Sequence, residues 1–358
     1  MQFTTLPHPS PMPAAERDAR LADPGFGTLF SDHMVTIDYD EAAGGWQDGV
    51  VGPRQPIALD PAAAVLHYAQ EIFEGMKAYK QPDGGIALFR PEANAARFNA
   101  SADRLAMPHL PEDVFIEAIR QLLAADKDWF PTVEGGSLYL RPFMIATEAF
   151  LGVRPAKQYK FMVIASPAGN YFKSGAKAVS IWISDYTRAA PGGTGAAKCG
   201  GNYAASLVPT GQAFAKGHDQ VLFLDAVERK WIEELGGMNL FFVMDDGRVI
   251  TPPLTGTILP GITRDSLITL LREEGLDVRE EMYSIDQWRE DAASGKLVET
   301  MACGTAAVVT AVGKVAGPDG EFTIGAGGIG QTTAKLREKL VGIQTGTVAD
   351  THGWVMKV

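Results

Sequence analysis

A single lysine between two glycine-rich runs is the residue whose surroundings most suggest chemistry. The stretch from Ala190 to Tyr203 reads APGGTGAAKCGGNY, with Lys198 between the two runs. Glycine has no Cβ, so a glycine-rich backbone can pass close to a flat ligand. Glycine-rich loops are also common on protein surfaces, where a lysine is merely solvated. The rest of the sequence has to decide between these two interpretations.

The pattern of a phosphate-binding loop does not fit this stretch. G-x-x-x-x-G-K-[ST] requires a glycine directly before the lysine and a hydroxyl directly after it, whereas Ala197 and Cys199 flank Lys198. A nucleoside triphosphatase is therefore not expected. The other chemistry that singles out one lysine is a Schiff base, in which the neutral amine attacks a carbonyl carbon.

Length and composition limit the class of protein. The chain has 358 residues, 46% of them hydrophobic, which is enough for about two domains with sizeable cores. Its net charge is −11 without a basic run, which argues against nucleic acid or an anionic membrane surface as a partner. Two cysteines are too few for a disulfide framework or a cysteine-rich metal site. With no apolar signal or membrane-length run, we expect a cytoplasmic protein with no metal.

The lysine must be positioned by strands and helices on both sides of it. Strands are predicted over 30–39, 56–59, 86–89, 137–146, 159–166, 179–185, 220–225 and 240–244. Helices are predicted from Pro91, from Pro111, over 203–216, from about Thr263 and over 332–341. Linker composition near 167–175 marks a boundary between an N-terminal domain (1–168), a linker (169–178) and a C-terminal domain (179–358) that carries the lysine.

Two arginines of the first half have alternative interpretations. Arg141 shares a face of the strand 137–146 with Tyr139 and Phe143. A buried arginine needs an anionic partner or a ligand that carries a carboxylate, and on this evidence a structural ion pair is as good an explanation as ligand binding. Arg97, on the helix that begins at Pro91, is either a functional residue or a solvated one, as arginines usually are.

Three features of the second half are equally open. Glu234 lies between apolar residues before a glycine pair, as either a water-facing acid at a strand edge or a buried partner of a cation. Thr263 or a neighbour would cap a helix whose first amides form an anion site, unless this is an ordinary helix start. Thr305, in a small-residue turn, either binds an anion or closes the turn.

These features converge on one kind of site. A lysine, a tyrosine, a buried acid, a helix N-terminus and a Gly-Thr turn are together what a pyridoxal phosphate site requires. The lysine bonds to the cofactor, the acid keeps the pyridine nitrogen protonated so that the ring accepts electrons, and a cup of amides holds the phosphate.

The motifs resemble those of the branched-chain amino acid aminotransferases, which are class IV, fold type IV pyridoxal-phosphate enzymes. The matching stretches run in family order from about residue 26 to the C-terminus: 73–78 (FEGMKA), 88–91 (LFRP), 138–142 (LYLRP), the Lys198 loop, Glu234 with 238–239 (MN), 259–264 (LPGITR) and 304–306 (GTA). Together they favour a functional lysine over a solvated one. The resemblance implies a mixed α/β, two-domain fold: a small N-terminal α/β domain, a larger domain with a β-barrel-like sheet, and the cofactor at their interface.

The resemblance also implies a role for each cofactor residue. Lys198 would form the internal aldimine with pyridoxal 5'-phosphate and then move the proton between the substrate Cα and the cofactor. Tyr203 would hydrogen-bond the phenolic oxygen of the cofactor, and Glu234 would pair with its pyridinium nitrogen. The phosphate would be held by Arg97, the amides of Ile262 and Thr263, and Thr305, with Arg188 supporting the site.

For the substrate, the resemblance implies that the amides of Thr305 and Ala306 bind the α-carboxylate. The walls of an apolar side-chain pocket would be Phe26, Tyr68, Phe73, Tyr139 and Tyr171. Tyr139 and Arg141 would let the same pocket accept the distal carboxylate of glutamate.

The implied activity is a reversible, ping-pong transfer of the amino group between L-leucine, L-isoleucine or L-valine and 2-oxoglutarate. A homodimer is also implied, in which the apolar loop Leu151–Val153 covers the pocket of the neighbouring subunit. Alternatives of the same fold are a D-amino acid aminotransferase and an aminodeoxychorismate lyase, against which the Tyr-x-Arg-Pro strand and the chain length argue. A catalytically silent protein that binds a cofactor or an amino acid is the alternative of a different class, against which the retention of Lys198, Tyr203 and Glu234 argues.

Two positions depart from parts of the family. Gly237 stands where many relatives have a threonine, so one hydroxyl near the α-carboxylate or the cofactor is expected to be missing. Ala307 and Thr310 stand where some relatives have a cysteine pair, so the redox switch of that pair is not expected. Cys199, beside Lys198, is either a reactive thiol or a small buried packing residue, and the second interpretation is favoured.

Overall fold

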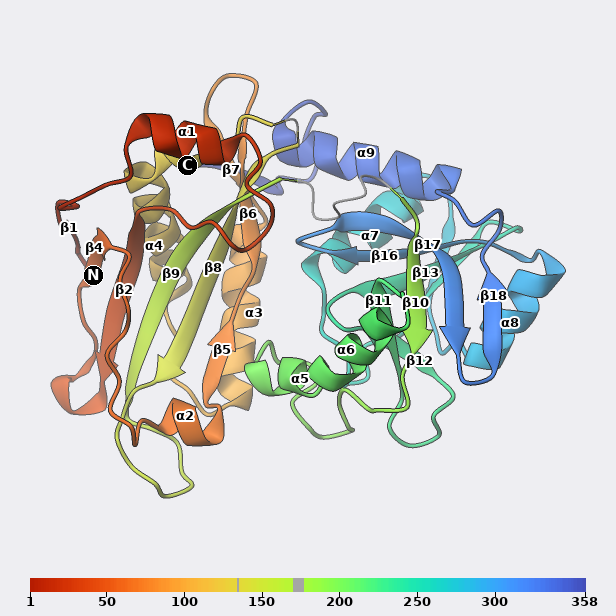
Figure 1. Cartoon of the computed structure of the whole chain (residues 1–358), viewed down its shortest axis with the longest axis horizontal. Helices are drawn as coiled ribbons and strands as arrows, with labels where there is room; N and C mark the ends of the chain where they lie inside the picture. The colour runs from red at the N-terminus through yellow and green to blue at the C-terminus, as the bar shows by residue number, and fades with distance from the viewer. Residues whose placement is uncertain (134, 170–176) are drawn as a thin grey trace. The chain divides into compact units, whose positions relative to one another are not determined.

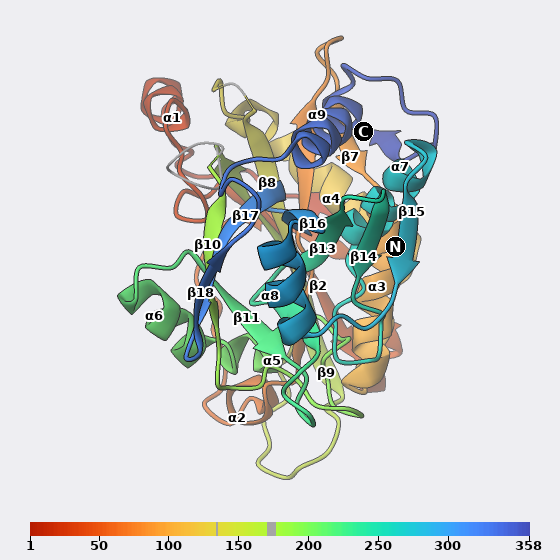
Figure 2. The same cartoon turned by 90° about the vertical axis from the view of Figure 1, so that its right-hand side faces the viewer.

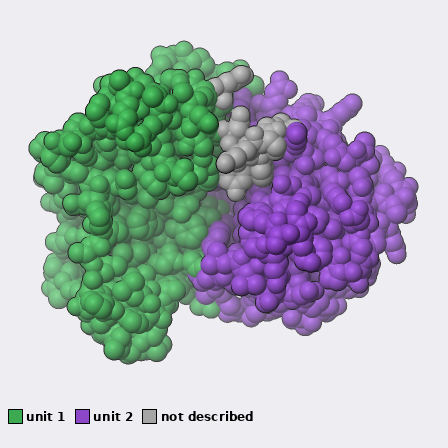
Figure 3. Space-filling model, in the orientation of Figure 1, with its two compact units in different colours: residues 1–173, 197–200, 343–358 green, residues 174–196, 201–342 purple. Residues whose placement is uncertain are grey.

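The computed structural model describes residues 1–133, 135–169 and 177–358 (Figure 1). The chain forms two compact units, shown in different colours in Figure 3. Unit 1 consists of Met1–Lys173, Ala197–Gly200 and Ile343–Val358, and unit 2 of Ser174–Ala196 and Gly201–Gly342. Each unit has its own sheet and its own helices.

Unit 1 is built on a ten-stranded sheet in the order β1-β4-β2-β9-β8-β6-β7-β19, with β3 paired to β2 and β5 to β8. The pairs are antiparallel apart from β1 with β4. The strands are β1 (Phe3–Thr5), β2 (His33–Asp40), β3 (Gly45–Trp46), β4 (Gly49–Pro53), β5 (Glu71–Phe73), β6 (Met76–Lys80), β7 (Ile86–Phe89), β8 (Ser137–Ala146), β9 (Gln158–Ala168) and β19 (Val355–Lys357). The helices are α1 (Ala14–Leu21), α2 (Ala64–Tyr68), α3 (Pro91–Arg104) and α4 (Glu112–Ala125), with single 3₁₀ turns at Glu41–Ala43 and Lys127–Trp129.

Helices α3 and α4 pack side by side against this sheet, α4 on β2 and β9 and α3 on β5 (Figures 1 and 2). Their contact is aromatic, with the ring of Phe98 on α3 centred 5.3 Å from that of Phe115 on α4 and 5.5 Å from that of Phe161 on β9. Phe115, Ile119 and Leu122 are all buried, which confirms the apolar stripe predicted for this helix. The core of unit 1 therefore holds α3 rigidly beside the end of β5.

Unit 2 is built on a nine-stranded sheet in the order β12-β11-β10-β17-β16-β13-β14-β15, with β18 paired to β17. The strands are β10 (Val179–Ile183), β11 (Gln220–Leu224), β12 (Ile232–Leu235), β13 (Asn239–Met244), β14 (Arg248–Thr251), β15 (Asp277–Glu280), β16 (Leu297–Gly304), β17 (Val308–Gly317) and β18 (Gly320–Thr323). Parallel pairs (β10 with β11 and β17, β14 with β15) occur beside antiparallel ones. Strand β12 also contacts β13 although four strands separate them in the sheet order, so the sheet is curled.

The helices of the second half are α5 (Gly200–Ala204), α6 (Leu207–Ala215), α7 (Ile262–Glu273), α8 (Ile285–Ser294) and α9 (Gln331–Thr345). Helix α6 packs on β11, α7 on β15 and β16, and α8 on β16 and β18. None of the described helices is long and apolar enough to cross a bilayer.

Most of the predicted elements are present, and three expectations are wrong. Residues 56–59 form no strand, and the helix predicted over 203–216 is two helices, α5 and α6. The break has a cause in the sequence, because Pro209 in the first turn of α6 has no N–H to donate to Ala205 and its ring clashes with that carbonyl. Thr263 does not cap α7, since the N-cap position is Gly261 and no side chain caps it.

The units differ from the predicted domains in two stretches. Ala197–Gly200 and Ile343–Val358 belong to unit 1, in the second case because β19 pairs with β7. Unit 1 consequently contains more of the chain than unit 2, the reverse of the expected sizes. Most of the predicted linker, 170–176, lies outside the described residues.

Candidate active site

The backbone of Lys198 is bound on both sides within unit 1. Its N–H donates to Oγ of Ser101 on α3 (2.9 Å), and its carbonyl accepts from the N–H of Phe73 on β5 (2.9 Å). Two residues on, the N–H of Gly200 donates to Oε1 of Glu71, and a Cβ at that glycine would lie 2.3 Å from the same oxygen. The second glycine run therefore permits a close approach of backbone to β5. The Lys198 amine lies 4.9 Å from the centre of the Phe73 ring.

Arg97 on α3 is directed by a buried carboxylate. Nε and Nη2 of Arg97 donate to the two oxygens of Glu74 at 2.7 and 2.8 Å, and Glu74 is completely buried. Burial by itself would raise the pKa of Glu74, but the charge and hydrogen bonds of Arg97, together with the charge of Lys198, lower it below its usual range. Arg97 is thus a fixed, partly buried cation and not a solvated one.

Strand β8 presents Arg141 among aromatic rings, as the alternation predicts. Its guanidinium carbon lies 4.8 Å from the centre of the Phe73 ring, and its Nη2 donates to the Tyr139 hydroxyl at 3.1 Å. The Tyr139 ring meets the ring of Phe26 edge to face at 5.2 Å. Nε of Arg141 is buried and has no hydrogen-bond partner among the described residues. Within that part of the chain no carboxylate forms an ion pair with Arg141, which leaves a ligand carboxylate as the better of the two interpretations.

The carboxylate of Glu71 interacts electrostatically with Arg141. Burial raises its pKa, and the Gly200 N–H and the charge of Arg141 lower it by less. Four residues after Glu71, a Cβ at Gly75 would lie 2.1 Å from the Tyr139 hydroxyl. The glycine of the FEG motif therefore makes room for the Tyr139 side chain.

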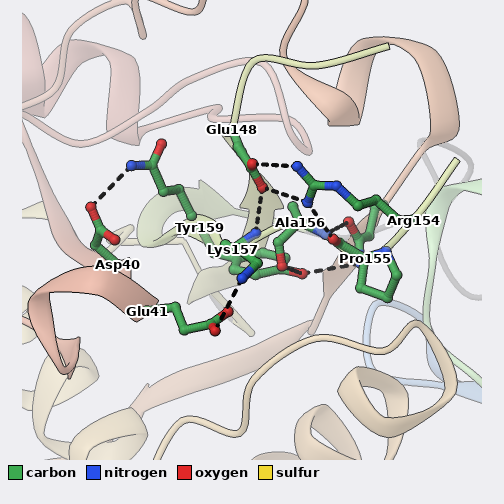
Figure 4. A network of polar contacts seen from close by, with 10 residues as sticks. Asp40, Glu41, Glu148, Arg154, Pro155, Ala156, Lys157 and Tyr159 are labelled. Atoms are coloured by element: carbon green, nitrogen blue, oxygen red, sulfur yellow. Dashed lines mark hydrogen bonds and ion pairs between the residues drawn. The ribbon is translucent and has the colours of Figure 1, made fainter. Parts of the chain in front are cut away.

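The base of the loop that carries Leu151 and Val153 is a network of polar contacts (Figure 4). Glu148 binds Arg154 through both carboxylate oxygens (2.7 and 3.1 Å) and accepts the N–H of Lys157 at 2.6 Å. At the tip, Leu151 and Val153 are 67% and 88% exposed.

Tyr68 and Tyr171 are two of the residues predicted to line the substrate pocket. The hydroxyl of Tyr68, at the end of α2, donates to the carbonyl of Leu151. Tyr171 lies outside the described residues.

In unit 2, Glu234 on β12 is buried and paired with a cation. Its Oε1 lies 2.7 Å from Nη1 of Arg188 and accepts the N–H of Leu259 at 3.2 Å. Arg188 also donates from Nη1 to the carbonyl of Thr257 (3.2 Å), and its guanidinium carbon lies 5.9 Å from the centre of the Tyr203 ring. Glu234 is therefore not a water-facing acid at a strand edge.

Glu233, next to it on β12, is a buried acid that the sequence analysis did not single out. Oγ1 of Thr257 donates to its Oε1 at 2.5 Å. Burial raises the pKa of Glu233, and the hydrogen bond from Thr257 offsets part of this effect. Two successive acids inside an apolar strand were the available signal, because one of them had to face each side of the sheet.

The predicted anion-binding residues begin α7 and fill a tight turn. Ile262 and Thr263 are the first two residues of α7, where N–H groups have no acceptor within the helix. A Cβ at Gly261 would lie 2.1 Å from Oδ1 of Asn239, so the glycine lets the start of α7 pack on β13. Thr305 and Ala306 lie in the hairpin turn between β16 and β17.

The predicted residues are divided between the units. Unit 1 holds Phe26, Tyr68, Phe73, Arg97, Tyr139, Arg141 and Lys198, and unit 2 holds Arg188, Tyr203, Glu234, Ile262, Thr263, Thr305 and Ala306. Cys199 is buried, as predicted. No cluster of histidine, cysteine, aspartate and glutamate within the described ranges is arranged to bind a metal.

The sequence profile of the amino-transferase class IV family matches residues 71–315, more than half of the chain. The chain therefore belongs to the class IV aminotransferases.

Relatives define the group within the family. The branched-chain-amino-acid aminotransferase of Mycolicibacterium smegmatis is 56% identical over 365 residues, which cover 100% of this chain and 98% of the relative. The crystal structure of the Escherichia coli branched-chain amino acid aminotransferase matches with a TM-score of 0.73 at 31% identity, over 83% of this chain and 93% of that one. The branched-chain amino acid aminotransferase of T.th. with pyridoxamine 5'-phosphate matches with a TM-score of 0.73 at 29% identity, over 89% and 97%. The protein is an aminotransferase of the branched-chain group, which confirms the resemblance and the fold class inferred from the motifs.

The buried acid Glu233 makes a pH-dependent difference to stability. The pKa of Glu233 is raised in the folded state. Ionisation of Glu233 therefore lowers the free energy of unfolding of the wild-type protein as the pH rises from the unfolded-state pKa through the folded-state pKa. Below the unfolded-state pKa the acid is protonated in both states, and this loss is absent. We expect Glu233→Gln, which keeps an oxygen for Thr257 but carries no charge, to raise the thermal midpoint at pH 7. The gain should shrink to nothing near about pH 4. Exposed Glu228→Gln is the control, and a loss of stability at pH 7 would contradict the prediction.

Proposed function

We propose that the protein catalyses the reversible transfer of the amino group between L-leucine, L-isoleucine or L-valine and 2-oxoglutarate, in a ping-pong reaction that uses pyridoxal 5'-phosphate. The observation that carries the proposal is Arg141, a partly buried cation whose buried Nε has no hydrogen-bond partner among the described residues, between the rings of Phe73 and Tyr139 and in the same unit as Lys198. An aliphatic side chain needs an apolar pocket, and glutamate needs a cation for its second carboxylate. An apolar pocket with one such arginine can accept both in turn.

The residues present fit pyridoxal phosphate. The group, when bound, supplies an aldehyde carbon and a ring that accepts an electron pair from the substrate. Lys198 offers a primary amine on a bound backbone, and Arg97 offers a guanidinium oriented by Glu74 for a phosphate. Glu234, a buried carboxylate paired with Arg188, is suited to a protonated ring nitrogen. In support, the T.th. relative is known with pyridoxamine 5'-phosphate.

Lys198 would bind the cofactor in the resting enzyme and afterwards carry the proton to and from the substrate Cα. Its amine lies against the Phe73 ring, and its charge acts on the buried carboxylate of Glu74.

The remaining contacts orient the reactants. Tyr203 would hydrogen-bond the phenolic oxygen of the cofactor, and the amides of Ile262 and Thr263, with Thr305, would hold its phosphate. The amides of Thr305 and Ala306 would bind the substrate α-carboxylate, with Phe26, Tyr68 and Tyr171 completing the pocket. This assignment is favoured over a D-amino acid aminotransferase or an aminodeoxychorismate lyase by the relatives, which are named for branched-chain substrates. The cytoplasmic location expected from the sequence stays a prediction.

A spectroscopic experiment tests the chemistry of Lys198. Purified protein loaded with pyridoxal phosphate should show a near-visible absorption band that L-leucine alone, without a keto acid, converts to the pyridoxamine form. Lys198→Ala should abolish the conversion and lower turnover by about 10⁴-fold, since both the covalent link and the proton carrier are lost. Lys216→Ala, at an exposed surface lysine, is the control. Unchanged turnover in Lys198→Ala would refute the mechanism.

A second experiment separates the two half-reactions. Arg141→Met keeps the length of the side chain and removes its charge. We expect kcat/KM for 2-oxoglutarate and glutamate to fall by about 100-fold or more, because charge-assisted hydrogen bonds to a carboxylate are lost. The leucine half-reaction should change by less than about tenfold. Single-turnover kinetics measure both, and equal losses for the two substrates would argue against Arg141 as the carboxylate ligand.

We also propose that the protein is a homodimer in which the loop tip Leu151–Val153 covers the pocket of the other subunit. The high exposure of two apolar side chains on a loop with a fixed base supports it. Light scattering should give twice the mass of one chain. Val153→Ser should reduce activity more than Val227→Ser, which changes another highly exposed valine elsewhere on the chain. A fully active monomer would disprove the proposal.

A further inference from the structure

One face of α3 reaches the surroundings of Lys198 at three points. Asn94, Arg97 and Ser101 are spaced by three and four residues, so they lie on the same side of the helix. Ser101 accepts the N–H of Lys198, while Asn94 and Arg97 both donate to Glu74, the residue after β5. Lys198 and Glu74 are therefore held by the same helix face.

The carboxylate of Glu74 is saturated with donors. Besides Nε and Nη2 of Arg97, it accepts Nδ2 of Asn94 at 2.7 Å and the N–H of Gly75 at 3.1 Å. Three of these donors bind Oε2 and one, Nε of Arg97, binds Oε1, so both carboxylate oxygens accept hydrogen bonds. The backbone of Glu74 is also tied down, since its N–H donates to the carbonyl of Pro142 on β8 at 2.7 Å. Neither the charge nor the position of this group can change without breaking several contacts.

Two cations share this one acid. Arg97 is bonded to it, and the charge of Lys198 acts on it through space. The other charged groups around β5 are Glu71 and Arg141, which act on each other. Without Glu74, the negative charge that acts on both Arg97 and Lys198 would be missing from a partly buried place. The acid makes it possible to keep both charges close together.

We propose that Glu74 is a positioning residue of the transaminase reaction. Its buried carboxylate fixes the Arg97 guanidinium for the cofactor phosphate, and its charge acts on the Lys198 nitrogen. This inference rests on the proposed function, because it assigns to Glu74 the tuning of that same site.

The test compares charge removal with charge retention in the holoenzyme. The near-visible band of wild-type protein, loaded with pyridoxal phosphate, is titrated with pH to find the midpoint at which the Lys198–cofactor link loses its proton. In Glu74→Gln the midpoint should move to lower pH by about one unit or more, because the opposite charge that acts on the Lys198 nitrogen is gone. Binding of pyridoxal phosphate to the apoprotein should weaken by about tenfold or more as Arg97 loses its anchor. Glu74→Asp, which keeps the charge at shorter reach, should retain the midpoint but lose affinity.

Asp126→Asn is the matched control. Asp126 is also a buried acid of unit 1, bonded to the ring and backbone N–H of His33, and it has no contact with the Lys198 surroundings. It should reduce stability without moving the midpoint or the cofactor affinity.

The outcomes separate this inference from the proposed function. If wild-type protein forms no band or does not respond to L-leucine, the proposed function fails. If wild type behaves as expected and Glu74→Gln leaves midpoint and affinity unchanged, Glu74 is not a positioning residue. If Glu74→Gln does not fold, the cofactor affinity of Glu74→Asp tests the inference instead. A weakened affinity supports the inference, and an affinity equal to that of the wild type overturns it.

Discussion

The anchoring of the Lys198 backbone is the constraint on which the rest of the structure depends. The lysine follows a loop of unit 2, yet both of its peptide groups are bound by unit 1, to Ser101 on α3 and to Phe73 on β5. In the role proposed for Lys198, a side chain that bonds to a ligand and then transfers a proton needs an origin fixed to a fraction of an ångström. The glycine at position 200 follows from the same constraint, because any Cβ there would overlap Glu71.

Each unit also buries an arginine–glutamate pair, Arg97 with Glu74 and Arg188 with Glu234. Removing two charges from water costs several kcal/mol per ion, so such pairs are poor devices for stability. Extra donors, Asn94 in one pair and the Leu259 N–H in the other, reduce the cost by satisfying the carboxylates.

Local features of the site could be predicted from the sequence, and long-range partners could not. The alternation along β8 placed Tyr139 and Arg141 on one face, and Pro91 marked the start of α3, because both depend only on neighbouring residues. Pro209 also indicates the break between α5 and α6, although one continuous helix was predicted there. Glu74 was recognised as part of a motif, but its bond to Arg97 joins residues 23 positions apart. Which side chains meet at that separation depends on how α3 packs on the sheet.

The sequence by itself determined the family and most of the helices and strands, and it predicted a role for Lys198. Those properties follow from residue types at short spacing, and several motifs in one order leave little freedom. Only the tertiary structure decided that Lys198 belongs with unit 1, that β19 completes the sheet of that unit, and that Glu233 and Glu234 are both buried. The physical reason is that burial and pairing are set by contacts between distant segments, which form only when the core closes around them.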